Sequence, residues 1–320
     1  MAIPTSRAKE KAQIYIDTAK CDGCGECVEV CNDFGLELVD EHVPSATPDQ
    51  KPEVIQKAKA KETPLFGCIA CGHCMAVCAR RAITINGRTL SQDDIFRLPT
   101  IRNKANYDQM LTLLQRRRSI REFIDRKVEP EIIEKILEAA VTSPMGIPPS
   151  DVNVLVFDTK EKNHRFAEDY CELLKSMKWY ISKWFLALMR PFMRKETAEM
   201  FHNFIRPLYY IYTGFMEKGI NVVSYDAPLM IYFYGSPYTD PADPIIAATT
   251  AMYAAESLGL GTCMLGAIHP LIQNGSKAKK FREKYGIKYT SREGLFVIFG
   301  YPSIRYRKGL KRTFASVKYN

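Results

Sequence analysis

Eight of the ten cysteines in this 320-residue sequence fall into two copies of one spacing. The first copy, CDGCGECVEVC, runs from Cys21 to Cys31 and spaces its cysteines as C-x2-C-x2-C-x3-C. The second copy, CIACGHCMAVC, repeats that spacing from Cys68 to Cys78. Cysteine thiolates bind zinc and iron–sulfur clusters. These two stretches are therefore the first candidates for metal chemistry in the chain.

The tight spacing favours iron–sulfur clusters over zinc. A structural zinc site usually takes two short pairs of ligands separated by a longer spacer, whereas each copy here already holds four cysteines. The spacing is that of bacterial ferredoxins, in which the fourth cysteine of each copy binds the cluster of the other copy. We therefore expect two [4Fe–4S] clusters, and zinc is the alternative. The expected ligand sets are Cys21, Cys24, Cys27 and Cys78 for one cluster, and Cys68, Cys71, Cys74 and Cys31 for the other.

The residues around the ligands support tight folding of the backbone about each cluster. Small residues stand between the ligands, namely Gly23, Gly25, Ala70 and Gly72. They are expected to direct backbone N–H groups at the cluster sulfurs. The stretches AQIYI and AITING, which flank the two motifs, are predicted to pair as strands. The spacer 32–67 contains Pro44, Pro48, Pro52 and the stretch KAKAKE, and we expect a loop and a short helix there. The proline that usually follows the fourth cysteine is replaced by Asn32 and Ala79.

The remaining two thirds of the chain predict a second, α+β domain. Two stretches, NYDQMLTLLQRR and PEIIEKILEAAVT, repeat apolar residues with helical spacing. Three short β-branched or aromatic runs, VNVLVF, LMIYFY and LFVIFG, are predicted strands. The stretch DPIIAATTAMYAAESLG is a predicted helix with Asp243 as its N-cap and Gly259 past its end. We expect domains at 1–90 and 106–320, joined by a linker at 91–105.

Residues 165–222 form an aromatic insert with helical periodicity, as in MKWYISKWFLALMRPFM and FIRPLYYIYTGFM. Its apolar stripe, which includes Ile181, Trp184 and Leu188, is too short to span a bilayer. We expect packing helices that cover the active site or wrap a partner subunit, and a helix on a membrane surface is the alternative.

The net charge of +9 is placed entirely in the second domain. Residues 1–104 carry 14 basic and 14 acidic side chains, so residues 105–320 hold the excess. The basic end of the chain is consistent with a solvated tail, a phosphate ligand or an acidic partner. No nucleic-acid-binding motif is present, and we expect no nucleic acid partner. No apolar run is long enough for a signal peptide or a membrane span, which predicts a cytoplasmic protein without a transmembrane segment.

Four stretches of the second domain resemble the nitroreductase family, in the order that the family has them. RRRSIREF resembles its flavin-phosphate segment, and AAVTSPMGIPPSDVNVLVF its second flavin loop. AAESLGLGTCMLGAI resembles the segment beside the flavin ring, and GYPSIRYRKGL the closing basic segment. With the cysteine motifs, nearly the whole chain is similar to ferredoxin–nitroreductase fusions. The resemblance implies a bacterial ferredoxin-like domain followed by a nitroreductase-like α+β sandwich, with FMN as the flavin.

The resemblance also implies which residues contact FMN. Guanidinium groups suit a phosphate, and the matching positions for the phosphate and ribityl chain are Arg117, Arg118, Ser119, Arg121, Arg305 and Arg307. The backbone at Leu265 and Gly266 matches the family's donor to flavin N5. In the second loop the family's asparagine is Pro148, so that side-chain contact is lost or relocated. Met145 and Gly146 can still contact the ring through their backbone.

The resemblance further implies a homodimer with two flavins at the subunit interface. The alanine-rich helix expected at 242–258 suits a subunit interface, and it suits the core of a single subunit almost as well. The predicted function is an oxidoreductase that passes electrons from an external low-potential donor, such as ferredoxin, through two clusters to FMN. The acceptor is a nitroaromatic, a quinone or an activated C=C compound. The alternative is an electron-transfer subunit whose flavin donates to a partner protein. No side chain is identified as a catalytic acid or base, and we expect His269 and Cys263 to be structural.

Overall fold

The computed structural model describes residues 4–31, 34–43, 53–62 and 67–319 of the chain. It divides into two compact units. We call the first the cluster unit, and it contains Met1–Lys104, Met145–Asp151 and Ser236–Asp240. We call the second the sheet unit, and it contains Ala105–Pro144, Val152–Gly235 and Pro241–Asn320. Both helices and strands occur in the chain, whose fold class is α+β.

The cluster unit is built from short elements around the cysteine motifs. Strands β1 (Gln13–Ile16) and β4 (Ile83–Asn86) pair antiparallel, which confirms the pairing predicted for AQIYI and AITING. Helix α1 (Glu26–Cys31) carries the last two cysteines of the first motif. Helix α2 (His73–Val77) carries Cys74 and ends just before Cys78. A small core of Leu36, Met75, Ile83 and Ile85 surrounds the buried thiols of Cys27 and Cys74.

The expectation of a loop and a short helix in the spacer is wrong for the residues that the structure describes. Strands β2 (Leu36–Val43) and β3 (Glu53–Ala60) form an antiparallel pair there. The reason is the alternation of the KAKA stretch, which has the two-residue period of a strand. Ala58 is buried in the core, whereas its neighbour Lys59 is exposed. Asn32, Pro44, Pro48 and Pro52 lie outside the described residues.

The last part of the cluster unit's first segment, residues 91–104, has little regular structure. The 3₁₀ turns η1 (Gln92–Asp94) and η2 (Ile101–Asn103) interrupt an otherwise irregular stretch. Helix α3 (Tyr107–Arg116) then begins at a capping box, in which Asn106 and Gln109 exchange hydrogen bonds of 2.9 Å. Tyr107, Met110 and Leu114 of the predicted apolar stripe are exposed in this chain.

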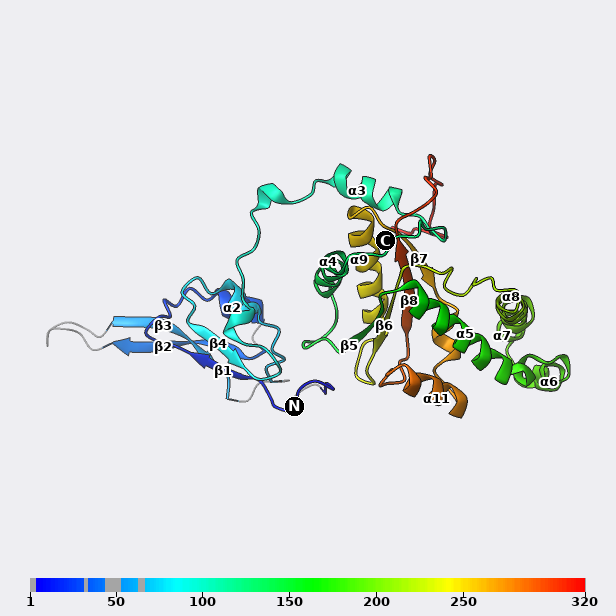
Figure 1. Cartoon of the computed structure of the whole chain (residues 1–320). Helices are drawn as coiled ribbons and strands as arrows, with labels where there is room; N and C mark the ends of the chain where they lie inside the picture. Colours follow the sequence, from blue (N-terminus) through cyan, green and yellow to red (C-terminus); the bar gives the residue numbers. More distant parts are fainter. Residues whose placement is uncertain (1–3, 32–33, 44–52, 63–66, 320) are drawn as a thin grey trace, which may run out of the picture. The chain divides into compact units, whose positions relative to one another are not determined.

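The sheet unit is centred on a four-stranded antiparallel sheet with the strand order β5-β6-β8-β7 (Figure 1). Its strands are β5 (Val152–Phe157), β6 (Leu229–Gly235), β7 (Gly261–Leu265) and β8 (Gly294–Gly300). Every residue of the two central strands, β6 and β8, is buried. A strand that is covered on both faces is apolar throughout, and this explains why their sequences read as continuous apolar runs. The sequence analysis predicted β5, β6 and β8, and it missed β7.

Helices cover both faces of the sheet. On one face, Tyr232 and Phe296 stack with ring centroids 3.8 Å apart. They belong to a core with α5 (Lys160–Ser176) and α11 (Ser276–Lys284). On the other face, α9 (Asp243–Ser257) contacts β6 and β8 and is backed by α4 (Pro130–Val141). The helix begins at Asp243 itself, so Ala242 rather than Asp243 is its N-cap.

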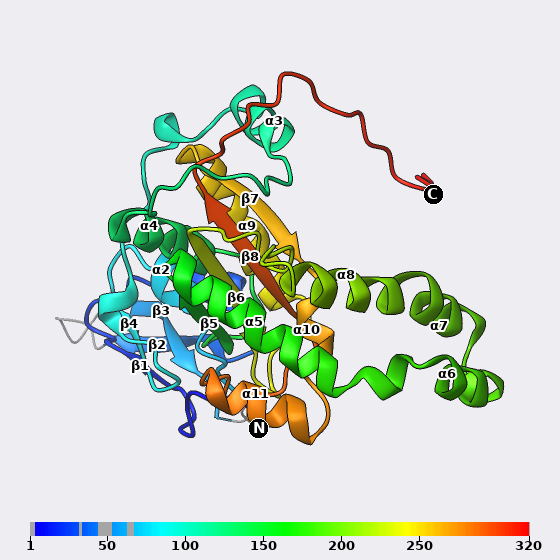
Figure 2. The same ribbon diagram turned by 45° about the vertical axis from the view of Figure 1, so that its right-hand side comes forward.

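The aromatic insert is helical, as predicted, and its far end extends away from the sheet (Figure 2). After α5 come the helices α6 (Lys183–Met189), α7 (Lys195–Met200) and α8 (Arg206–Met216). The shorter turns η3 (Lys178–Ile181), η4 (Arg190–Phe192) and η5 (Phe201–Ile205) lie between them. Among the described residues, no helix is long and apolar enough to cross a membrane.

Candidate functional site

The structure gathers the cysteines of the cluster unit into two crossed sets. Burial, followed by the neighbouring thiols of Cys21, Cys24 and Cys78, raises the pKa of Cys27. Burial, followed by the neighbouring thiols of Cys68, Cys31 and Cys71, raises the pKa of Cys74 to about 12. Each set contains three cysteines of one motif and the fourth cysteine of the other. This exchange is the one expected for a two-cluster ferredoxin.

Backbone N–H groups are already directed at several of these thiols. Ala58 donates to Cys21 Sγ at 3.5 Å, Ala70 to Cys68 Sγ at 3.4 Å, and Ala82 to Cys78 Sγ at 3.2 Å. Hydrogen bonds of this kind stabilise cluster sulfurs and tune the cluster potential. The strand pairing supplies two of these donors, because Ala58 belongs to β3 and Ala82 directly precedes β4.

Glycine is required at the first motif for steric reasons. Gly23 has a φ of +74°, and a Cβ added to it would lie 2.2 Å from the carbonyl oxygen of Gln56. A residue with a side chain could not occupy this position without moving β3. Close packing of β3 against the first motif therefore depends on this glycine.

The number and spacing of the cysteines suit two cubane clusters better than zinc. Zinc draws four ligands into one shell of about 2.3 Å radius, whereas a cubane is held at four separate iron corners.

In the sheet unit, a strongly basic cavity lies at the start of β7. Its volume is about 590 Å³. Arg118, Arg305 and Arg307, three of the residues predicted to bind phosphate, all line it. Arg116 and Lys308 add two further cationic groups. Glu256 is the one acid among the described residues of the lining, and its carboxylate lies 3.9 Å from Nε of Arg116.

The predicted phosphate segment, RRRSIREF, lies beside β7 and forms one parallel bridge with it. Ser119 pairs with Thr262 in parallel, and Ile120 N donates to Thr262 O at 2.9 Å. The close approach requires Gly261, because a Cβ there would lie 2.7 Å from the Ile120 side chain. This segment fixes the positions of the arginines relative to the sheet.

Because the segment is extended, its side chains alternate between two sides. Arg118 faces the basic cavity, together with Arg116 and Ile120. Ser119 and Arg121 lie beside the thiol of Cys263 instead. Burial raises the pKa of Cys263, and the nearby Arg121 partly opposes this shift.

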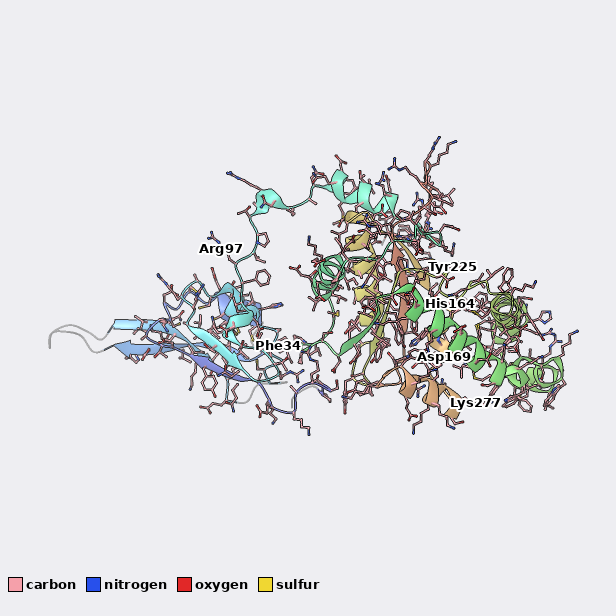
Figure 3. The ribbon with its side chains drawn as sticks, in the orientation of Figure 1. Phe34, Arg97, His164, Asp169, Tyr225 and Lys277 are labelled. Atoms are coloured by element: carbon pink, nitrogen blue, oxygen red, sulfur yellow. The ribbon has the colours of Figure 1, made fainter. Side chains whose placement is uncertain are left out.

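The far end of β7 holds the predicted backbone contact to N5. Leu265 is the last, buried residue of the strand, and Gly266 follows it as an exposed residue. Two tyrosines lie near Arg121 of the predicted phosphate segment. The Arg121 guanidinium lies 5.7 Å from the ring centroid of Tyr225, which Figure 3 labels. Tyr212 of α8 is an electrostatic neighbour of Tyr225, Cys263 and Arg121.

Met145 and Gly146 are not grouped with the other candidate flavin residues. They belong to the cluster unit, within the stretch Met145–Asp151. In that unit, Nη2 of Arg88 donates to Pro148 O at 2.7 Å. The carboxylate of Asp151 accepts from the backbone N of Ser6 at 3.0 Å. These two contacts join residues far apart in the chain, so no local sequence pattern indicates them.

A second cavity, with a volume of about 500 Å³, lies beneath the aromatic insert. The insert lines it with Trp179, Tyr180 and Tyr209, and the opposite wall includes Leu271 of α10 (Ile268–Leu271). Lys277, labelled in Figure 3, also lines it. Tyr170 OH donates to Ala267 O at 3.2 Å, which ties α5 to the segment that follows Gly266. The cavity is mostly apolar and suits a flat or greasy molecule.

His269 and Cys263 are both buried in the sheet unit. Nδ1 of His269 lies 2.9 Å from Tyr232 OH and 3.3 Å from Nε2 of Gln273. Burial lowers the pKa of His269. Tyr209 and Tyr212 of the insert belong to the core of the sheet unit, whereas Tyr210 is 48% exposed.

Sequence reasoning missed Arg116, Lys308 and Tyr225. Arg116 begins the stretch RRRSIREF and Lys308 lies in the basic closing segment, but neither is among the residues expected to contact FMN. Tyr225 lies in a loop just before β6, where its backbone has a φ of +55°. Only the fold brings it to Arg121. The basic composition of RRRS and RYRK was the one signal available for the two cations.

Comparisons with known proteins agree with this geometry in both units. The nitroreductase family matches residues 114–301, and the 4Fe-4S dicluster domain matches residues 13–79. The chain is 29% identical over 163 residues to the FMN reductase [NAD(P)H] of Bacillus subtilis (strain 168). That alignment covers 50% of this chain, which spans only about half (55%) of the length of this curated relative.

Several solved structures are similar to part of this chain. A nitroreductase with bound FMN from Desulfitobacterium hafniense DCB-2 is 21% identical, with a TM-score of 0.46, over 66% of this chain and 97% of that one. An FMN-dependent nitroreductase from Clostridium difficile R20291 is 22% identical, with a TM-score of 0.43, over 66% and 99%. A nitroreductase with bound FMN from Bacteroides fragilis NCTC 9343 is 16% identical, with a TM-score of 0.47, over 68% and 99%.

The crossed cysteine sets have the arrangement of a two-cluster ferredoxin, and the sheet covered on both faces belongs to an α+β fold. The chain belongs to the nitroreductase family and carries a 4Fe-4S dicluster domain before the family's own domain. The predicted ferredoxin–nitroreductase fusion is thereby confirmed.

Proposed function

We propose that this protein passes electrons from an external low-potential donor, such as a reduced ferredoxin, through two [4Fe–4S] clusters to FMN and on to an organic acceptor. The acceptor class is a nitroaromatic, a quinone or an activated C=C compound. The protein is an FMN- and iron–sulfur-dependent oxidoreductase, and its cofactors are FMN and two [4Fe–4S] clusters. The observation that carries the finer proposal is the basic cavity at the start of β7.

The basic cavity suits the phosphate end of FMN. A phosphate monoester carries nearly two negative charges and accepts paired hydrogen bonds from guanidinium groups. Arg118, Arg305 and Arg307 supply such groups from two segments that are distant in the sequence. Arg116 is also held there, and its ion pair with Glu256 offsets part of the positive charge. We assign this cavity to the phosphate, with Arg117, Ser119 and Arg121 along the ribityl chain.

The length of β7 separates the two ends of the proposed site. A five-residue strand spans about 15 Å, so the phosphate cavity at Gly261 and the donor at Gly266 lie well apart. When bound, FMN exchanges single electrons with the clusters and transfers them to the acceptor. The chain's own part is to place backbone N–H groups at Leu265 and Gly266 beside the ring, where they stabilise negative charge. Met145 and Gly146 remain proposed ring contacts from the second loop.

The apolar cavity under the insert is the proposed place for the acceptor. Its aromatic wall and Leu271 exclude water from a bound molecule. Trp179 and Tyr180, whose ring centroids lie 3.7 Å apart, both line the cavity. Flat aromatic acceptors such as nitroarenes and quinones match this wall. No acidic side chain is assigned to the reaction, and solvent supplies the protons.

We place the domain boundaries at 1–90 and 106–320, with the linker at 91–105 and the aromatic insert at 165–222. The division of the chain between Lys104 and Ala105 supports this organisation. We also propose a homodimer in the cytoplasm. The exposed apolar face of α3, with Tyr107 at 76% exposure, offers a surface for a second copy. Much of the alanine-rich α9 is buried within one subunit against the sheet, so it supports the dimer less than its sequence suggested.

The test is reduction and reoxidation of the flavin under anaerobic conditions. Reduced ferredoxin should bleach the flavin absorbance of the holoenzyme, and a nitroarene, a quinone or an enone should restore it. Cys31→Ala should remove one cluster and slow reduction by ferredoxin. The matched control is Cys171→Ala, which removes a buried thiol of α5 outside both cluster sets. A flavin that is reduced but is reoxidised by none of these acceptors would contradict the proposed enzyme.

The alternative is an electron-transfer subunit whose flavin donates to a partner protein. Exposed apolar residues of the insert, such as Trp184 and Leu188, could then form its docking surface. The two functions differ in one measurement. If small acceptors fail to reoxidise the flavin and a purified redox protein reoxidises it, the protein is an electron-transfer subunit.

A further inference from the structure

Residues 178–206, the far part of the insert, carry a surface outside the apolar cavity, and the proposed function does not use that surface. We call this part the arm. Helix α6 has the sequence KWFLALM, and none of its residues is buried. Helix α7 likewise buries none of its residues. Trp184 is 64% exposed, Leu188 61% and Phe192 81%. A surface helix ordinarily buries its apolar face, so the arm presents an apolar face that no described residue of the chain covers.

The arm is also strongly basic. It contains six basic and two acidic side chains, which gives a net charge of +4. Its basic residues are Lys178, Lys183, Arg190, Arg194, Lys195 and Arg206. A groove of about 670 Å³ runs between α6 and α7 and is lined by Lys183, Arg190 and Lys195. Glu199, the one acid among the described residues of its lining, lies 3.9 Å from Nζ of Lys195.

One cation in this groove is poised for an additional ligand. Arg206 lines the groove, and its Nε is buried without a hydrogen-bond partner among the described residues. A buried guanidinium N–H without an acceptor is costly. A phosphate or carboxylate oxygen in the groove would satisfy it. The groove therefore has the chemistry of a site for an anionic group.

We propose that the arm docks on an anionic phospholipid surface. Lipid phosphates enter the groove, and Trp184, Leu188 and Phe192 enter the boundary between head groups and acyl chains. Helices that bind in the plane of a membrane combine Lys and Arg with Trp, Phe and Leu in this manner. Tryptophan is favoured at this depth because its ring is apolar and its N–H is polar. The protein lies on the membrane and does not cross it, in keeping with the lengths of its described helices.

Charge favours a lipid surface over a second copy of the chain. The whole chain carries +9, and the excess is in residues 105–320, so a basic arm would meet a basic partner. An anionic leaflet attracts basic residues by about 1 kcal/mol each near the surface. A bilayer also accepts exposed aromatic side chains without a complementary groove, whereas a protein partner must supply one.

The chain carries a built-in probe of this surface, because its only two tryptophans, Trp179 and Trp184, lie in the arm. The experiment mixes the full holoprotein with vesicles of phosphatidylcholine, with or without phosphatidylglycerol. Flotation measures binding, and quenching of tryptophan emission by brominated acyl chains measures insertion. We expect flotation and quenching only with phosphatidylglycerol, and both should weaken as the salt concentration rises.

Two variants separate the charged from the apolar part of the arm. Lys183→Glu with Arg190→Glu should lower vesicle partitioning by at least about tenfold. Phe192→Ser with Leu188→Ser should lower quenching while leaving part of the salt-sensitive binding. Lys279→Glu with Lys280→Glu on α11 and Phe96→Ser with Leu98→Ser in the linker are matched exposed controls, and they should bind as the parent does.

The outcomes distinguish this inference from the proposed function, because flotation requires no turnover. Absence of binding to anionic vesicles would overturn the inference and leave the electron-transfer proposal intact. A change from dimer to monomer in the arm variants, without any vesicle binding, would show that the arm joins two copies. Binding of inorganic phosphate without vesicle binding would show an anion site that is not for lipid.

Discussion

Each of the two units of this chain is stabilised internally by a different physical effect. In the sheet unit, β6 and β8 are buried along their whole length, and helices cover both faces of the sheet. In the cluster unit, the core is small and two of its buried side chains are thiols, Cys27 and Cys74. Small domains rarely bury enough apolar surface to fold without disulfides or metal. We infer that the sheet unit is stabilised mainly by apolar burial and the cluster unit mainly by its inorganic ligands.

The difference also appears in how each unit uses its backbone. In the cluster unit, residues in the left-handed region are concentrated near the ligands, as at Gly23, Gly25 and Ala70. The chain must turn sharply to bring four thiols to one cluster. In the sheet unit, the functional groups come from the ends and edges of long elements, such as β7. Such positions are fixed by packing rather than by a bound ligand.

The largest expected effect is that of iron removal. Chelation under reducing conditions should unfold the cluster unit, because thiolates that bind metal contribute their binding energy to folding. The helical and sheet signals of the sheet unit should persist, and FMN should still bind. Circular dichroism and limited proteolysis on apo and holo protein check this. If the amino-terminal third resists proteolysis equally well without iron, the contrast between the units is wrong.

The next prediction compares two glycine substitutions in the cluster unit, one that adds a steric clash to a positive φ and one that has the positive φ without a clash. Gly23→Ala should destabilise the unit by about 2–5 kcal/mol, because it adds a clash with Gln56 O to the penalty of a positive φ. Gly67→Ala is the matched control: its φ is +73°, but a Cβ there would meet no described residue within 4 Å. It should cost about 1–2 kcal/mol. The rate of cluster loss in oxygen or chelator measures both, and equal rates would contradict the structure.

A third change tests the site of the sheet unit. Arg305→Ala should weaken FMN binding by about 10- to 100-fold, since it removes a charge-assisted hydrogen bond of about 1.5–3 kcal/mol. Arg312→Ala removes an exposed arginine of the same tail that does not line the basic cavity. It should leave the affinity unchanged. Fluorescence titration of the apo-flavoprotein with FMN gives both constants, and the cluster absorbance should be the same in both variants.

The smallest expected effect is a pH dependence of the sheet unit. Burial lowers the pKa of His269 below its ordinary value of 6.5, so the folded state holds the imidazole neutral. Its neighbours are Tyr232 of β6, Gln273 and Glu293. The unfolded chain takes up a proton below pH 6.5 and the folded chain does not. Stability is therefore full above that pH and falls as the pH decreases towards the folded-state pKa.

Thermal unfolding of the sheet unit, followed by flavin release, measures this slope. His269→Gln should reduce the slope between about pH 6.5 and 5, although it also lowers the midpoint at pH 7.5 by removing packing. His202→Gln removes an exposed imidazole of the arm and should leave the slope in place. An unchanged slope in His269→Gln would mean that other groups set the acid stability.

The spacing of the cysteines by itself predicts the cluster ligands, because cysteines close together in the chain are limited in which cubane corners they can reach. The sequence also determined β5, β6 and β8, whose apolar runs are long enough to be unambiguous, and the helical nature of the insert. The spacer was misread, because its alternating lysines and alanines carry a weak strand signal that the prolines obscured. Strand β7 was missed because its sequence, GTCML, has no clear period.

Only the tertiary structure decided which cations share a cavity. Arg118 and Arg307 are distant in the sequence, and no local pattern says that the tail returns to the start of β7. Side chains of the extended segment RRRSIREF alternate between its two sides. Arg118 therefore lies on one side, and Ser119 and Arg121 lie on the other. Contacts of this kind depend on the packing of elements that are far apart in the chain. The local sequence cannot encode them, whereas the spacing of the cysteines is itself local.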